Sequence, residues 1–116
     1  MADVVLTREQ IVVAGIDPTD NAIDATDVYF VDNQPGQVFL HFKNTGGSPS
    51  AVTFDTTQQV GGLDIEDPIV TVPATTGDRM IGPFPAHYEV KGGANDGQIK
   101  FTQDQASGVT VSALRL

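Results

Sequence analysis

The stretch FLHFKNTGGSPSAVTFD, residues 39–55, combines two alternating runs with a turn-forming segment between them. Apolar and polar residues alternate from Leu40 to Lys43, and the alternation resumes over 51–55 after a run of small residues. Such a period of two is typical of half-buried β-strands. Gly and Asn tolerate positive φ and Pro presets a turn, so residues 44–49 are predicted to form a corner or hairpin joining two strands. Because loops on a rigid sandwich often carry binding sites, a contact role for this segment is a second hypothesis.

The same pattern extends through most of the chain. Short runs rich in β-branched and aromatic residues are separated by Gly, Pro and Asn, and no strand pattern alternates with a long helical one. The predicted strands are 28–31, 38–43, 51–56, 69–72, 79–81, 98–102 and 109–114. We therefore predict an all-β fold, an antiparallel β-sandwich of about seven or eight strands, Ig-like or jelly-roll-like.

The 116 residues suit one compact domain that needs no disulfide, and there is no cysteine. The sequence divides into an irregular N-terminal segment, 1–27, and a β-sandwich domain, 28–116. The spacing of Thr7 and Gln10 matches a capping box, but the β-branched residues that follow argue against a long helix. The irregular segment is predicted to act as an arm that lies along a neighbouring subunit, with partner-binding side chains at Val4, Leu6, Ile11 and Val13.

The charge balance excludes several function classes. The formal net charge is −9, and six basic residues are scattered among fifteen acidic ones. Binding to nucleic acid or to an anionic membrane needs clustered Lys and Arg, so neither partner is expected. The N-terminal sequence has no basic region followed by a long apolar stretch, so no secretion signal is predicted and synthesis in a cytoplasm is expected.

Motifs for catalysis and metal binding are also missing from the sequence. It contains no Gly-x-Ser-x-Gly elbow, phosphate loop or dinucleotide fingerprint, so an enzyme is not expected and no cofactor is predicted. Two separated histidines, His41 and His87, without cysteine do not make a zinc site. The acidic groups at 17–27 and 64–67 are interpreted as solvated loops, with a weak calcium site as the alternative.

The segment 81–85, Ile-Gly-Pro-Phe-Pro, is predicted to lie away from the centre of any sheet, since proline removes backbone donors. Two roles are open for Phe84. It either closes the end of the core, as large apolar side chains usually do, or is presented to a partner as a further binding residue.

Three stretches resemble a group of small proteins encoded near the major capsid gene of tailed bacteriophages. They are the opening stretch, VGGLDIEDPIVTVPATTGDRMIGPFP and GVTVSALRL. The shared features are a strand ending in Lys-Asn, a Gly/Ser/Pro corner, a Thr/Val-rich strand, a Val-Pro element, an Ile-Gly-Pro-Phe segment and a closing Val-rich strand. Here they occupy 39–44, 46–49, 51–54, 70–73, 81–84 and 109–116, and LTREQIVVAGIDP is a vaguer match.

This resemblance implies a structural virion protein that decorates and stabilises the capsid exterior, with the major capsid protein as its partner. Three-fold decoration would use either a homotrimer or three monomers. Two alternatives stay open. One is a neck or tail component, and the other is a carbohydrate-binding module, for which the chain offers no Trp and only Tyr29 and Tyr88.

Overall fold

The computed structural model describes residues 3–34, 36–56, 59–60, 62–64, 67–90 and 93–116. These residues form β-strands and one short 3-10 turn, η1 (Ala86–Tyr88), with no α-helix, which confirms the all-β prediction. The strands are β1 (Asp3–Leu6), β2 (Glu9–Gln10), β3 (Asn21–Ile23), β4 (Val28–Asp32), β5 (Val38–Asn44), β6 (Ser50–Phe54), β7 (Gln59–Val60), β8 (Leu63–Asp64), β9 (Ile69–Val72), β10 (Gly77–Ile81), β11 (Gln98–Gln103) and β12 (Val109–Arg115).

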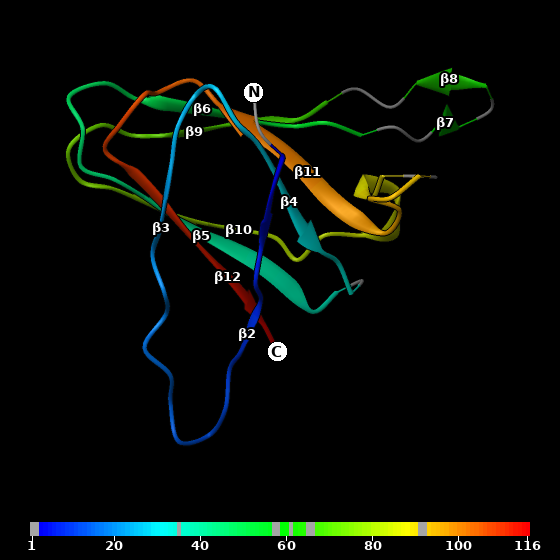
Figure 1. The fold of residues 1–116 in the computed structure, drawn as a ribbon, viewed down its shortest axis with the longest axis horizontal. Coiled ribbons are helices and arrows are strands. Elements are labelled where there is room, and N and C mark those ends of the chain that lie inside the picture. Colours follow the sequence, from blue (N-terminus) through cyan, green and yellow to red (C-terminus); the bar gives the residue numbers. More distant parts are fainter. Residues whose placement is uncertain (1–2, 35, 57–58, 61, 65–66, 91–92) are drawn as a thin grey trace.

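Ten of these strands form two five-stranded sheets. Sheet A has the order β1-β4-β11-β6-β9, and sheet B has the order β10-β5-β12-β2 with β3 also paired to β12. β7 and β8 form a separate hairpin that projects from the sheets in Figure 1. All seven strands predicted from the alternation are present, with ends that differ by one or two residues.

Both sheets are mixed, so the predicted purely antiparallel arrangement is wrong. β1 pairs parallel to β4, and β2 pairs parallel to β12. Parallel neighbours require a crossover connection. The chain supplies one by leaving sheet A after β1, passing through β2 and β3 in sheet B, and returning to sheet A at β4.

Of the ten strands in the two sheets, the three that were not predicted all come from the segment predicted to be irregular. β1, β2 and β3 contain four, two and three residues, and each pairs within the same chain. Strands this short carry too little alternation to be identified locally. Each of them is a strand because it pairs with a longer one: β1 pairs with β4, and β2 and β3 pair with β12. Residues 3–10 and 21–23 therefore belong to the body of the domain.

The opening stretch is a corner between the two sheets. β5 lies in sheet B and β6 lies in sheet A, so residues 45–49 cross from one layer to the other. The buried Asn44 organises the crossing. Its Nδ2 donates to the Ser48 carbonyl at 2.9 Å, and its Oδ1 accepts from the Gly46 amide at 2.9 Å. A buried amide that is satisfied in this way specifies one geometry for the chain.

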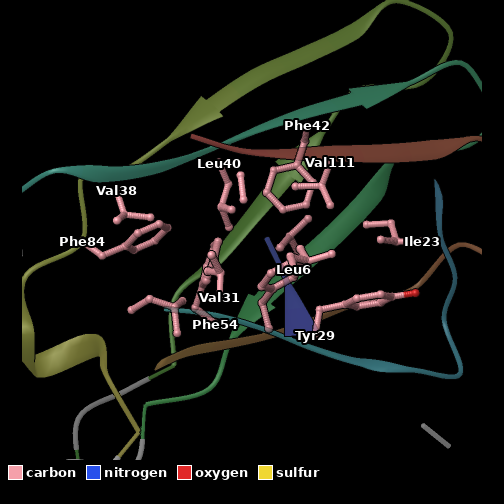
Figure 2. Close-up of a cluster of buried hydrophobic side chains, with 14 of the residues drawn as sticks. Leu6, Ile23, Tyr29, Val31, Val38, Leu40, Phe42, Phe54, Phe84 and Val111 are labelled. Atoms are coloured by element: carbon pink, nitrogen blue, oxygen red, sulfur yellow. The ribbon is translucent and has the colours of Figure 1, made fainter. Parts of the chain in front are cut away.

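The core lies between the two sheets. In β5, Val38, Leu40 and Phe42 are fully buried while the alternate side chains are half-buried, which is the burial expected of an alternating, half-buried strand. Figure 2 shows these three side chains pointing toward residues of sheet A. The rings of Phe42 and Phe101 meet across the layers with centroids 5.5 Å apart, edge to face. Aromatic pairs of this geometry stabilise beyond the area they bury.

The 81–85 segment closes one end of this core. Ile81 ends β10, and residues 82–85 follow it outside both sheets, as the prolines predict. The Phe84 side chain is only 2% exposed, and its ring lies 5.2 Å from that of Phe54 and 6.2 Å from that of Tyr88. Figure 2 places it beside Val38. The first of the two interpretations of Phe84, closure of the core, is therefore confirmed.

Candidate functional site

The predicted partner-binding residues separate into buried and exposed groups. Leu6 and Phe84 belong to the core, where they are 6% and 2% exposed, and the half-buried Val4 packs against it. Ile11 and Val13 are exposed, and Val13 is fully so. Of the five residues, these two have exposed side chains.

Two further exposed apolar side chains lie near them, Val12 in the same loop and Leu116 at the end of the chain. We define the apolar tip as Ile11, Val12, Val13 and Leu116, with exposed fractions of 39%, 46%, 109% and 61%. Ile11 lies beside the end of β12, because its amide donates to the Arg115 carbonyl at 2.8 Å. Figure 1 shows the loop between β2 and β3 extending beyond the sheets. Exposed apolar side chains that lie close together mark interaction surfaces in soluble proteins.

Hydrogen bonds hold this loop at its base. The Thr19 amide donates to Glu9 Oε1 at 2.7 Å, which joins the two sides of the loop. The Gly15 amide donates to the Val12 carbonyl at 2.9 Å and forms the turn at its tip. Because its base is cross-linked, the loop presents its apolar side chains at a smaller entropic cost on binding than a free arm would.

A polar cluster on the outer face of sheet B fastens the same loop to the sheet. The Ser112 hydroxyl donates to Asp20 Oδ1 at 2.8 Å, and Lys43 Nζ lies 3.5 Å from Asp20 Oδ2. The Asn21 amide group donates to the Val111 carbonyl at 3.1 Å. These contacts join the start of β3 to β5 and β12, and they explain why residues 19–22 follow the sheet.

The same face holds a histidine, a serine and an aspartate, the residue types of a hydrolytic triad. His41 and Ser112 are opposite each other on β5 and β12, and His41 Nε2 contacts Asp78 on β10. However, the Ser112 hydroxyl is buried and donates to Asp20, whereas a nucleophilic serine gives its proton to the histidine. The observed contacts hold neighbouring segments of the sheet together. The side chain of His87 lies outside the described part of the chain.

The acidic residues mostly serve as local hydrogen-bond acceptors. Asp24 Oδ1 accepts from the Thr26 amide, the Thr26 hydroxyl and the Asp27 amide, and these hydrogen bonds lower the pKa of the Asp24 carboxyl. Asp67 Oδ1 accepts from the Thr56 amide at 2.9 Å and from its hydroxyl. Glu66 lies outside the described residues, among which no cluster of three metal-ligating side chains occurs.

A cleft opens next to the loop, where the two sheets diverge. We call it the N-terminal cleft. It has a volume of about 640 Å³ and lies between β1 and residues 19–22. Val4, Leu6 and Tyr29 contribute apolar surface, whereas Asp20 and Glu9 contribute charge. The sequence did not predict this cleft, because its two walls are brought together only when β1 joins sheet A and β3 joins sheet B.

Tyr29 lies between this cleft and the core. Its ring stacks on Phe101 with centroids 5.6 Å apart, and its hydroxyl oxygen accepts from the Asp24 amide at 2.9 Å. Burial raises the pKa of the Tyr29 phenol, and the nearby carboxylates of Asp24 and Asp27 act in the same direction. The stabilisation that comes from the neutral phenol is fully present below the unfolded-state pKa. It is lost as the pH rises through the folded-state pKa.

This shift is testable in the variant Tyr88→Phe, which leaves Tyr29 as the single tyrosine. We expect the phenolate absorbance to rise with a midpoint above 10.0, the ordinary value for tyrosine. Spectrophotometric titration at 295 nm measures it, while circular dichroism confirms that the domain stays folded. A midpoint equal to that of the urea-unfolded variant would show that Tyr29 is solvated.

Comparison of the chain with protein-family models, with curated proteins and with solved structures finds no match. In the described part of the chain there is no helix of the length and apolar character that crossing a bilayer requires.

Proposed function

We propose that this protein is a structural component of a bacteriophage virion that binds the outer surface of the capsid and stabilises it. The observation that carries the proposal is the apolar tip, in which three exposed apolar side chains come from a projecting loop held at its base by hydrogen bonds and the fourth is Leu116. The sequence resemblance to small head proteins supplies the identity of the partner, the major capsid protein. The site of action is the capsid exterior, and no catalytic step is involved.

The body of the domain supports this role as a rigid carrier. Consecutive strands β4, β5 and β6 alternate between sheets A and B. An Ig-like sandwich places its first two strands in one sheet, so the alternation favours a jelly-roll-like arrangement. We therefore propose a jelly-roll-like sandwich as the fold type. A rigid two-layer body transmits force between the subunits that it bridges.

The protein would stabilise the capsid by binding more tightly to its mature, expanded lattice than to any other state of the shell. Each contact that exists only in the mature, expanded lattice adds to the stability of that state. The net charge of −9 keeps a protein of high local copy number soluble and favours docking onto a basic patch of the capsid. Three-fold positions would be filled by a homotrimer or by three monomers.

The test is co-sedimentation with mature capsid shells that lack this protein, with bound copies counted at saturation. We expect saturation at a copy number set by the lattice symmetry. The variant Val13→Asp should bind about tenfold more weakly or worse, because a carboxylate on the apolar tip must be desolvated on docking. Absence of wild-type binding at low and moderate salt would contradict the proposal, and a count of a few copies per virion would then favour the neck or tail.

Met80→Asp is the matched control. Met80 is 65% exposed and lies on β10, at the opposite edge of sheet B from β2. The Met80→Asp variant also replaces an exposed apolar side chain with a carboxylate, but it does so away from the apolar tip. Equal loss of binding in the two variants would show that added charge, and not the tip, is responsible.

A further inference from the structure

The N-terminal cleft is bounded by a sheet edge. Among the described residues, β4 is the one strand that pairs with β1, so the other side of β1 is an edge of sheet A. An edge strand presents backbone donors and acceptors to any extended chain that approaches it. β1 contains no proline, and Val5 on it is 57% exposed. Its backbone is therefore suited to receive another strand.

The cleft provides the side-chain surface that such a strand needs. Val4 and Leu6 follow each other at the two-residue spacing of a β-strand and both line the cleft, with Tyr29 from β4. Ala22 lines the opposite wall and is exposed. An extended peptide on β1 would direct every second side chain at this apolar surface. A volume of about 640 Å³ accommodates several side chains.

The charge around the cleft selects the peptide. The first 27 residues contain one basic side chain, Arg8, and six acidic ones: Asp3, Glu9, Asp17, Asp20, Asp24 and Asp27. Glu9 and Asp20 line the cleft itself. Complementary charge steers an encounter and excludes unsuitable partners. An acidic peptide is disfavoured at this edge, and a basic one is favoured.

We infer that the N-terminal cleft binds an extended segment of the capsid protein, in which apolar residues alternate with Lys or Arg, as an added strand on β1. The partner's identity rests on the proposed function, whereas the chemistry of the segment rests on the cleft. Main-chain hydrogen bonds to β1 would provide affinity, and the alternate apolar side chains would provide specificity. The apolar tip and the cleft would then be two separate contacts with one partner.

A defined probe tests the cleft directly. The full-length protein is titrated with a nine-residue peptide that alternates Val with Lys and Thr, and backbone amide resonances are followed by NMR. We expect saturable shifts at residues 3–6 and 19–22. The same peptide with Glu in place of Lys, and a version with N-methyl groups at alternate backbone nitrogens, should each bind about tenfold more weakly.

Ala22→Lys and Ala25→Lys form the matched pair of variants. Both alanines are exposed and the charge change is identical, but Ala25 is not among the residues that line the cleft. Ala22→Lys should weaken the basic peptide about tenfold while Ala25→Lys leaves it almost unchanged. Equal effects in the two variants, or shifts outside residues 3–6 and 19–22, would overturn the inference.

Capsid shells separate this inference from the proposed function. Shells that bind the wild type and Ala25→Lys but release Ala22→Lys support both. Shells that bind all three proteins equally overturn the cleft inference and leave decoration standing. Shells that bind none of them overturn decoration, while the peptide titration still decides the chemistry of the cleft. A dimer in sedimentation velocity that Ala22→Lys dissociates would identify a second copy as the occupant and contradict the inference.

Discussion

Replacing Phe101 with alanine is expected to lower the free energy of unfolding by about 3–5 kcal/mol, the range for truncating a fully buried aromatic residue. Phe101 is fully buried at the centre of the aromatic cluster. Its ring lies 5.6 Å from that of Tyr29, 5.5 Å from that of Phe42 and 5.9 Å from that of Phe54. The substitution removes ring contacts within sheet A and across the two layers, and it leaves a cavity in the core between the sheets.

Urea denaturation followed by circular dichroism measures this loss. A single domain of this size is stable by about 5–15 kcal/mol, so the variant either unfolds at much lower urea or does not fold. Phe101→Leu keeps most of the volume and should lose less, which keeps the prediction testable if the alanine variant is unfolded. Met80→Ala, at an exposed apolar position, should change stability by about 0.5 kcal/mol or less. An equal loss of unfolding free energy in Phe101→Ala and Met80→Ala would show that Phe101 is not at the centre of the core.

Replacing Gly77 with alanine should also destabilise the domain strongly, by about 3 kcal/mol, at the upper end of the range for overpacking. A Cβ atom at Gly77 would lie 1.9 Å from the Pro73 carbonyl oxygen and 2.9 Å from Val72 Cγ1. The nearer contact is with backbone, so a side-chain rotation cannot relieve it. The turn between β9 and β10 would have to move. That turn supports the corner through the hydrogen bond from the Thr75 amide to the Gly46 carbonyl, 2.8 Å.

Gly47→Ala is the control for this substitution. Gly47 lies in the same corner, and a Cβ atom there would meet no atom within 4 Å. We expect its midpoint of urea denaturation to equal that of the wild type or to rise slightly, because alanine reduces the entropy of the unfolded chain. If Gly77→Ala proved as stable as Gly47→Ala, the close approach of Gly77 to Pro73 would be incorrect.

The two-layer body was accessible from the sequence because its strands carry their own signals. β5 and β6 each alternate over at least five residues, so the face that points inward is set by the side chains themselves. The segment 44–49 combines Asn, Gly, Ser and Pro, whose backbone preferences demand a change of direction. The prolines on either side of Phe84 predicted the end of the strand, but the sequence left two roles open for the ring, and the structure decided between them.

The candidate site was less accessible. Leu6 and Val13 are both apolar residues in a segment without clear alternation, yet Leu6 is buried and Val13 is fully exposed. The difference arises because β1 pairs with β4, while the loop after β2 projects past the end of β12. Pairing partners about 25 and 105 residues away cannot be inferred from local pattern.

Four features could therefore be predicted from the residues alone: the β-class, the seven strands between residues 28 and 115, the inward faces of the longer strands and the acidic character of the surface. Each of these depends on local side-chain chemistry. The tertiary structure alone decided the parallel pairing of β1 and β2, the fastening of residues 19–22 to sheet B, the N-terminal cleft and the apolar tip. Those features depend on long-range contacts between short segments, whose individual preferences are too weak to select one arrangement before the core has formed.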